Sequence, residues 1–385
     1  MNKVLVHLGL IDHIGPATIA GLITQMGSSL EQLYGLSIGD CVERFGMPTL
    51  TAQRLVHGLR DTQLLEQELA RITKAQCNVV TIDEPQYPAL LRTIYAPPPV
   101  LYYFGTLPSY ERCIALVGAR KADSYAQAVI ETLVPDLVAA GWQVISGGAL
   151  GVDTLAHAVT IAIGGSTTAV LGSGLLELYP FSNKKLFERI ILHGGCVMTP
   201  FPLLTTPLPG NFPARNRIIA GLSHMCVVIQ AQQKSGARIT AQFALEQGRE
   251  VGAVPGAITN PLSEGCHALI REGAQIITSA ADIFALFGQL PRNHEQQVVI
   301  PADGSMRKTN VVPIESSGFT VRETSIDVAN MPLPEAIKHL CAQGPCLLDD
   351  LITKTGAPLF AVQDALFDLN LAGVTKQLSP GLWGI

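Results

Sequence analysis

Short apolar runs rich in β-branched residues alternate with segments of helical length, and this alternation constrains the fold more than any other feature of the chain. From Cys113 onward the runs are CIALVGAR, WQVISGG, STTAVLGSG, GCVMTPF, HMCVVIQA, REVGAVPG and AQIITS. Segments long enough for helices lie between them, among them 124–140, 151–163 and 236–247. Buried parallel strands joined by helices produce this pattern, so we predict an α/β fold with a doubly wound, mostly parallel sheet.

The regions on either side of this alternation differ from it. Residues 1–90 contain short helical patterns, and GLIDHIGPATIAGLI has the apolar–Gly–Pro turn of a helix-hairpin-helix or SAM-like unit. A plain helical packing domain is the alternative, because few basic residues surround Gly15. Residues 289–330 gain Pro, Ser, Thr and charge, which predicts a linker. Residues 331–385 have the helix, helix and Gly-containing hairpin order of a winged helix.

Composition excludes several classes of protein. The chain has 385 residues, of which 48% are hydrophobic and 15% charged, so two or three domains can bury cores. Apolar runs stay shorter than the roughly 18 residues that a membrane helix needs, and the first residues make a poor signal peptide, which predicts a cytoplasmic protein. The eight cysteines are scattered and form no C-x-x-C pair. They indicate buried thiols in a reducing compartment, and we expect neither metal nor cofactor.

Basic residues are concentrated in one stretch, although the formal net charge is -5. Between Leu178 and Leu245 the single acid is Glu188. A local basic patch attracts a polyanion, whereas a solvated surface is the simpler alternative. The basic residues of this stretch are Lys184, Lys185, Arg189, Arg215, Arg217, Lys234 and Arg238.

Small or basic residues follow the predicted strands. Ligands bind beyond the carboxyl ends of parallel strands, and glycine lets a ligand approach the backbone. Ser235 is placed to cap a helix opening at Gly236, whose first amides are free to hold an anion. Turn geometry alone is the alternative role for each glycine. The strand ends carry Gly118-Ala119-Arg120, Ser146-Gly147-Gly148, Gly172-Ser173-Gly174, Lys234-Ser235-Gly236 and Pro255-Gly256.

The segment NFPARNRIIAGL, residues 211–222, is predicted to start a helix because Pro213 favours a first helical turn. Arg215 and Arg217 stand two positions apart, so a regular helix turns them about 200° away from each other. The two guanidinium groups therefore cannot grip the same phosphate. One is expected to reach a ligand, while the other braces a loop or meets the next phosphate of a strand.

Several long motifs, in order, resemble the DNA-processing protein A family, also called DprA or Smf. They are LVGARKADSYAQ, the stretch from ISGGALGVDTLAHAV to PFSNKKLFERI, PGNFPARNRIIAGLS, KSGARITAQFALEQGREVGAVPG and ITNPLSEGCHALIREGA. The resemblance covers residues 110–288 strongly. It implies an extended Rossmann-like sheet over residues 91–288, usually dimeric. It also implies a protein that binds and protects single-stranded DNA and helps to load the RecA recombinase during natural transformation.

The resemblance also assigns site residues, position by position. The family's arginine after the first strand corresponds to Arg120, and its Asn–basic–x–Leu segment begins at Asn183. The family often has Gly-Ser-Arg where this chain has Gly118-Ala119-Arg120, and often an acid near the end of the fifth strand, where this chain reads Val228-Ile229-Gln230. Together with the strand ends, these matches predict a DNA-binding site of Gly118, Arg120, Gly147, Gly148, Gly172, Gly174, Asn183, Lys184, Asn211, Arg215, Asn216, Arg217, Lys234, Ser235 and Gly236.

Other functions remain as alternatives. Rossmann-like phosphoribohydrolases cleave nucleotides with an acid near a helix start, but here the first acid of that helix, Glu246, lies too far along it. A dinucleotide dehydrogenase would need a G-x-G-x-x-G motif after the first strand, and this chain does not have the motif there. Asp153 and His157 share a helix face and suit either an acid–base pair or, more simply, a carboxylate paired with a structural histidine. The candidate recognition helix of the winged helix, 358–370, holds two acids and no Lys or Arg, which predicts a protein-contact module.

Overall fold

The computed structural model describes residues 1–27, 29–107, 109–287, 331–342, 346–357, 362, 365–366, 369, 375–379 and 382–384. The chain forms two compact units, residues 1–295 and 296–385. The predicted linker, 289–330, lies outside the described residues. Within the described residues no helix is both long and apolar enough to cross a membrane.

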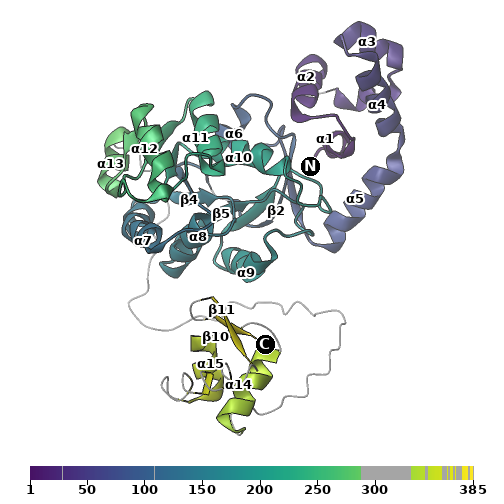
Figure 1. The fold of residues 1–385 in the computed structure, drawn as a ribbon. Helices are drawn as coiled ribbons and strands as arrows, with labels where there is room; N and C mark the ends of the chain where they lie inside the picture. Colours follow the sequence, from purple (N-terminus) through teal and green to yellow (C-terminus); the bar gives the residue numbers. More distant parts are fainter. Residues whose placement is uncertain are drawn as a thin grey trace, which may run out of the picture. The chain divides into compact units, whose positions relative to one another are not determined.

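A nine-stranded sheet in the order β1-β2-β6-β5-β4-β3-β7-β8-β9 forms the centre of the first unit (Figure 1). From β6 to β9 every neighbouring pair is parallel, while β2 pairs antiparallel with both β6 and β1. Each strand expected from the alternation is present, which confirms the mostly parallel α/β sheet. The strands are β1 (Asn78–Thr81), β2 (Val100–Gly105), β3 (Cys113–Val117), β4 (Gln143–Ser146), β5 (Thr167–Val170), β6 (Cys196–Thr199), β7 (Met225–Val228), β8 (Glu250–Ala253) and β9 (Gln275–Ile276).

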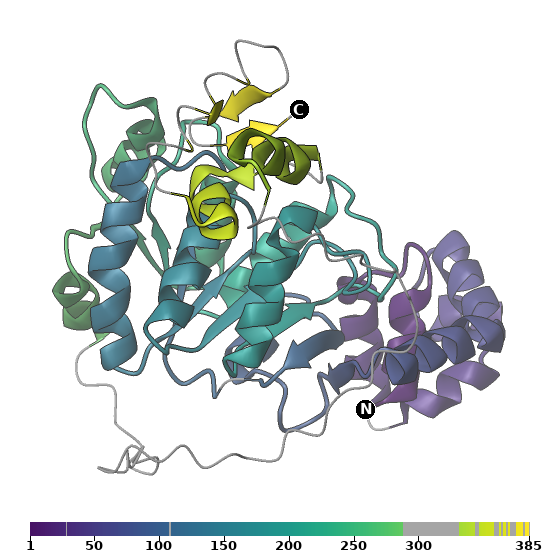
Figure 2. The same ribbon diagram turned by 90° about the horizontal axis from the view of Figure 1, so that it is seen from below.

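Helices cover both faces of the sheet, because successive strand residues point to opposite sides. Ile114 and Leu116 of β3 pack against α7, α8 and α13, while Ala115 and Val117 pack in the core that contains α10, α11 and α12. Figure 2 shows α7, α8 and α9 side by side across one face. Burying each such side chain contributes about 1.5–3 kcal/mol. The helices are α6 (Ala89–Arg92), α7 (Ser124–Ala139), α8 (Val152–Ala162), α9 (Lys184–Leu192), α10 (Asn211–Gly221), α11 (Gly236–Glu246), α12 (Glu264–Arg271) and α13 (Ala280–Phe287), with 3-10 turns η2 (Phe181–Asn183) and η3 (Pro261–Ser263).

Short helices make up the N-terminal region, as the sequence predicts. Pro16 occupies the first turn of α2 after Gly15, and Ser37 with Asp40 forms a capping box that starts α3. Their apolar side chains share one continuous core with residues of β2, β5 and β6, and α1 contacts β2 directly. The elements are α1 (Lys3–Leu10), α2 (Pro16–Met26), η1 (Leu30–Gly35), α3 (Ile38–Phe45), α4 (Thr49–Arg60) and α5 (Thr62–Lys74).

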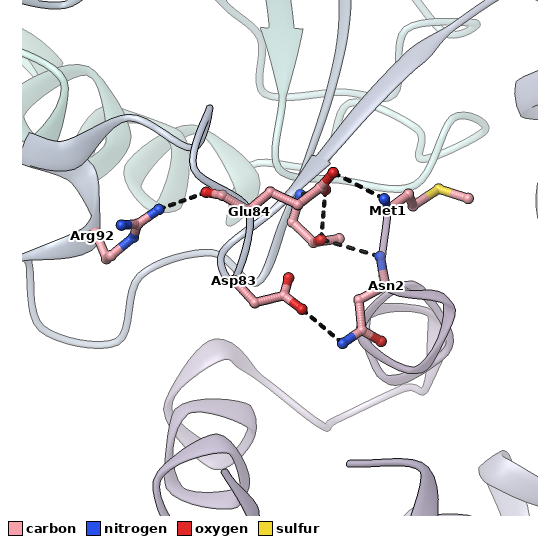
Figure 3. A network of polar contacts seen from close by, with 6 residues as sticks. Met1, Asn2, Asp83, Glu84 and Arg92 are labelled. Atoms are coloured by element: carbon pink, nitrogen blue, oxygen red, sulfur yellow. Dashed lines mark hydrogen bonds and ion pairs between the residues drawn. The ribbon is translucent and has the colours of Figure 1, made fainter. Parts of the chain in front are cut away.

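Polar contacts join the start of α1 to the turn that follows β1 (Figure 3). The Met1 amino group lies 2.9 Å from a carboxylate oxygen of Glu84, and the Asn2 side-chain amide donates to Asp83 over 2.9 Å. Arg92 donates to the Glu84 carbonyl from the other side. This turn lies between β1 and β2, which pair with each other in the sheet. The domain boundary expected at residue 90 therefore falls between two strands of one sheet. The NVVT run of β1 is too short to show a period, which is why the sequence does not reveal it.

The described part of the second unit contains α14 (Leu333–Ala342), β10 (Cys346–Leu347), α15 (Leu348–Thr355), β11 (Lys376–Ser379) and β12 (Leu382–Gly384). The three strands pair in the order β10-β12-β11. Ile337, Leu340, Leu351, Val362 and Leu366 form its buried core. Most of the candidate recognition helix, 358–370, lies outside the described residues, including both of its acids.

Candidate nucleic-acid interface

The sheet changes direction between β3 and β7, and a crevice opens at the carboxyl ends of these strands. From β3 the chain proceeds through β4, β5 and β6 on one side, then returns to β7 and β8 on the other. Such switch points are where open α/β sheets bind ligands. The crevice encloses about 380 Å³, and its lining includes Gly118, Arg120, Lys121, Asp153, Phe212, Arg215, Asn216, Lys234, Ser235 and Gly236.

The turn after β3 brings Arg120 to the crevice. A Cβ atom on Gly118 would lie 2.6 Å from the Val152 side chain and 2.9 Å from the Gln230 carbonyl oxygen. Glycine is therefore needed here for the close approach of β3, α8 and the β7 end. The Arg120 side chain is exposed, and its guanidinium carbon lies 5.5 Å from the centre of the Phe212 ring. It is thus a cation held over an aromatic face and open to solvent.

The opposite wall of the crevice is the N-terminus of α11. Ser235 accepts a hydrogen bond from the Ala237 amide over 3.2 Å, which confirms the predicted cap. Gly236 is exposed, and a Cβ there would meet nothing within 4 Å. Lys234 is exposed next to it. The helix dipole adds positive potential to that of Lys234, so this wall favours an anion.

Arg215 reaches the crevice from α10, but most of its side chain is buried. Only 4% of the residue is exposed, and its Nη1 donates to the carbonyl oxygens of Gly147 and Val170. A Cβ on Gly147 would collide with this guanidinium. Burial lowers the pKa of Arg215 to about 10, against the raising effect of the nearby Asp153 charge. Arg215 therefore braces the ends of β4 and β5, and its Nε has no hydrogen-bond partner.

Arg217 points away from the crevice, as the two-residue spacing predicts. Its Nη1 donates to the carbonyl oxygens of Tyr95 and Ala96 in the loop before β2. Asn216, between the two arginines, lines the crevice and donates to the Gly236 carbonyl at 3.4 Å. The structure thus brings Arg120, Arg215, Asn216 and Lys234 together and separates Arg217 from them.

Asn183 and Lys184 lie at the start of α9, outside the lining of the crevice. Asn183 is buried, and its amide donates to the Gly148 carbonyl over 2.9 Å and to the Thr154 hydroxyl over 2.8 Å. It fixes the turn after β4. Lys184 is exposed, with its Nζ 5.9 Å from the centre of the Phe181 ring.

The remaining predicted positions are close-packed against protein atoms. A Cβ on Gly148 would lie 2.7 Å from Phe187, and one on Gly172 would lie 2.9 Å from Phe212. A Cβ on Gly174 would collide with the Leu203 carbonyl. These three glycines permit tight packing at the strand ends. This agrees with the alternative in which a glycine after a strand serves the local geometry and not a ligand. Asn211 donates to the Thr206 carbonyl at 3.2 Å and holds the loop before α10.

Asp153 and His157 bond to different partners, so the expected pairing of the two is not present. The Asp153 carboxylate accepts from the amides of Gly147 and Ala149 over 3.1 and 3.3 Å. His157 is fully buried, and its Nδ1 lies 2.8 Å from the Thr167 hydroxyl. Burial raises the pKa of Asp153 and lowers that of His157 to about 3. The helical spacing of Asp153 and His157 indicates a shared helix face, but it does not identify their partners. The loop after β4 bonds Asp153, and Thr167 of β5 bonds His157.

Sequence patterns missed several residues that shape the site. Phe212 and Lys121 line the crevice, and Phe212 also packs against Tyr179. Glu68, on α5, is fully buried and accepts the Leu203 amide over 2.8 Å, which anchors the loop leading to α10. Phe212 lies inside the quoted PGNFPARNRIIAGLS motif, and its place there, near the predicted arginines, is the signal that could have drawn attention to it.

The charge of the crevice is mainly positive. Arg120, Lys121 and Lys234 are exposed cations from two loops, and in the described part of the chain none of them forms an ion pair. The carboxylate in the lining, Asp153, is largely buried. By contrast, Arg238 of the basic stretch is bound to Glu272 at 2.7 Å. Among the described residues no group of three or more His, Cys, Asp or Glu side chains is arranged to hold a metal ion.

A doubly wound sheet with a cation-lined crevice at its switch point places the chain in the Rossmann-like class. Residues 78–288 match the family model described as DNA recombination-mediator protein A, and the chain belongs to that family.

Similar proteins agree with this assignment. The Smf protein of Synechocystis is 34% identical over 362 residues, covering 90% of this chain and 88% of the relative. The DNA processing protein DprA of Bacillus subtilis is 40% identical over 234 residues, or 60% and 77% of the two chains. The X-ray structure of DNA processing protein A from Streptococcus pneumoniae superimposes with a TM-score of 0.65 at 32% identity, covering 74% of this chain and 98% of that one.

Proposed function

We propose that this protein binds single-stranded DNA, protects incoming DNA and helps to load the RecA recombinase during natural transformation. The observation that carries the proposal is the crevice, where Arg120, Lys121 and Lys234 meet the open N-terminus of α11. Exposed cations drawn from separate loops suit a ligand with several phosphates. Membership of the recombination-mediator family supports the same function.

The geometry favours a strand of phosphates over one small anion. Arg120 and Lys184 are both exposed and stand on different strand-to-helix connections, and only Arg120 of the two lines the crevice. A polymer can contact both, whereas a single phosphate cannot. Gly118 and Gly236 also line the crevice, and without side chains they let a ligand approach the backbone there. We therefore keep Arg120, Asn216, Lys234, Ser235 and Gly236 as proposed DNA contacts, with Lys184 as an outlying one.

We further propose that the crevice binds without catalysis. The alternative is a nucleotide hydrolase of the phosphoribohydrolase type, which needs an accessible acid near the helix start. Glu246 ends α11 instead of opening it. Asp153 lines the crevice, but the residue is buried and one of its carboxylate oxygens, Oδ2, accepts both backbone amides. Release of free base from nucleoside monophosphates incubated with the pure protein would favour the enzyme.

Salt-dependent binding to labelled oligonucleotides tests the main proposal. Each lost phosphate contact makes the log–log salt slope for a single strand shallower by about 0.7. We expect Arg120→Ala and Lys234→Ala to weaken binding and to flatten the slope by roughly that amount. Arg271→Ala, an exposed cation near the end of α12, is the charge-matched control. Unchanged affinity and slope in both crevice variants would place the DNA site elsewhere.

The partners and location are proposed on separate grounds. A homodimer and a contact with RecA follow from the family resemblance. A cytoplasmic location fits the cysteines, since all eight are free and buried in the structure, as is usual in a reducing compartment. Sedimentation of the pure protein, with and without RecA, tests both associations.

The two flanking regions complete the proposal. We infer that residues 331–385 form a winged helix, because α14, β10, α15 and the β11–β12 hairpin follow the order of that fold. We infer that the N-terminal helices form a helix-hairpin-helix or SAM-like module. The acids of the candidate recognition helix would repel phosphates. Truncation after residue 290 should therefore leave single-strand affinity within about tenfold, or 1.4 kcal/mol.

A further inference from the structure

Two aromatic side chains stand exposed between β5 and α9, outside the crevice. Phe181 is 74% exposed and Tyr179 is 42% exposed. Both belong to the segment Tyr179-Pro180-Phe181 that leads into η2. Most large apolar side chains of this unit are buried, and an exposed phenyl ring forgoes the stabilisation that burial gives. A single exposed apolar side chain needs no explanation, whereas neighbouring ones form a candidate surface for a ligand.

Two cations lie close to aromatic rings of this surface. The Arg120 guanidinium lies over Phe212 at 5.5 Å, and Phe212 contacts Tyr179 with ring centres 5.6 Å apart and planes at 58°. Two residues along the chain from Tyr179, Phe181 has the Lys184 Nζ 5.9 Å from the centre of its ring. We call Arg120, Phe212, Tyr179, Phe181 and Lys184 the aromatic row. A small hollow connects its first members with Leu150 and Pro180.

The protein holds the row in place before any ligand arrives. Asn183, which ends η2, is buried and bonded to the Gly148 carbonyl and the Thr154 hydroxyl. These bonds fix the turn from which Phe181 projects. An aromatic side chain loses little further entropy when its backbone is already fixed. The exposed ring is therefore a preorganised surface and not a loose end.

We propose that Tyr179 and Phe181 are stacking surfaces for unpaired bases of the strand whose phosphates Arg120 and Lys184 contact. This inference rests on the proposed function. A set of aromatic rings with a cation at each end suits a single strand, because its bases can stack on the rings while its phosphates meet the cations. A duplex hides the faces of its bases within the stack, so the aromatic row selects single strands. The phosphate-binding crevice by itself does not make that distinction.

The test compares two ligands and three proteins. The ligands are a labelled oligothymidylate and an abasic oligomer of equal length, which keeps the phosphates and lacks the bases. The proteins are wild type, Phe181→Ala and Tyr95→Ala. Tyr95 is 84% exposed before β2, away from the row, and serves as the matched aromatic control. Phe181 is so exposed that its replacement should leave folding intact, which thermal unfolding checks.

Stacking contributes about 1–3 kcal/mol per base, so Phe181→Ala should weaken oligothymidylate binding about 5- to 150-fold with an unchanged salt slope. Its binding to the abasic oligomer should equal that of wild type, and Tyr95→Ala should bind both ligands normally. If wild type binds oligothymidylate and Phe181→Ala binds it equally well, or loses equally on both ligands, the stacking proposal is overturned alone. If wild type fails to bind oligothymidylate, the proposed function falls and the stacking role falls with it.

Discussion

Arg215 offers the sharpest test of how this site is built, because the sequence presents it as a DNA contact and the structure buries it. In Arg215→Met the side chain keeps most of its length and loses its charge and donors. The carbonyl oxygens of Gly147 and Val170 then lose their partner inside the protein. Each buried unpaired polar group costs about 1–3 kcal/mol. Asp153 also loses the neighbouring cation that opposes the rise in its pKa.

These losses add up to an expected destabilisation of about 3–5 kcal/mol, the range found when one partner of a buried charged network is removed. Urea unfolding followed by circular dichroism measures it. Arg120→Ala is the matched comparison, since Arg120 is exposed and its loss should change the free energy of unfolding by less than about 0.5 kcal/mol. The two arginines should thus separate cleanly: Arg215 in stability, Arg120 in DNA affinity.

The refuting result is specific. If Arg215→Met unfolds within about 1 kcal/mol of wild type, yet binds DNA weakly with a shallower salt slope, then Arg215 faces the ligand and does not brace the sheet. Its unpartnered Nε would be the donor to a phosphate in that case.

Three further outcomes concern two buried residues, His157 and Glu68, and the half-buried Arg217. The pKa of His157 falls from an ordinary 6.5 to about 3 on folding, so the unfolded chain binds more protons between these values, and stability should drop as pH falls through that window. Unfolding at pH 7 and pH 5 should show a loss of about 2 kcal/mol that His157→Gln lacks. Glu68 positions the loop that leads to α10 through its bond to the Leu203 amide. Glu68→Gln should therefore lower DNA affinity and speed amide exchange at Leu203 without changing the salt slope, whereas the exposed Glu66→Gln should do neither. Unaltered exchange at Leu203 in Glu68→Gln would contradict this positioning role. Arg217→Ala should lower stability by about 1–3 kcal/mol without changing DNA affinity, and a loss of affinity would return it to the DNA site.

The sheet could be predicted from sequence because its strands are buried on both faces and therefore form continuous apolar runs. The meeting of Arg120 and Lys234 in one crevice could be predicted for a related reason, since parallel strands put both residues at one edge of the sheet. The helical spacing also showed that Arg215 and Arg217 must diverge. It could not show which one is buried, because that depends on how α10 is rotated against the ends of β4 and β5.

The missed features share a physical cause. The four-residue strand β1 gives no period, and exposure of Tyr179 or Phe181 is decided by tertiary packing that a local pattern does not contain. A glycine after a strand also has the same sequence signature whether a ligand or a side chain approaches it. Gly147 illustrates the point: its missing Cβ makes room for a guanidinium of the protein itself.

Gly147 and Arg215 also suggest why a DNA-binding assay alone would misassign this site. The buried guanidinium ties the ends of β4 and β5 together, and the turn after β4 in turn holds Asn183 and the start of α9. Lys184 and Phe181 stand on that start. Replacing Arg215 would therefore disturb exposed groups that it never touches, and affinity would fall as it does for a true contact. A contact residue changes the salt slope at constant stability, whereas a brace changes stability first, so only the two measurements together identify which cations meet the strand.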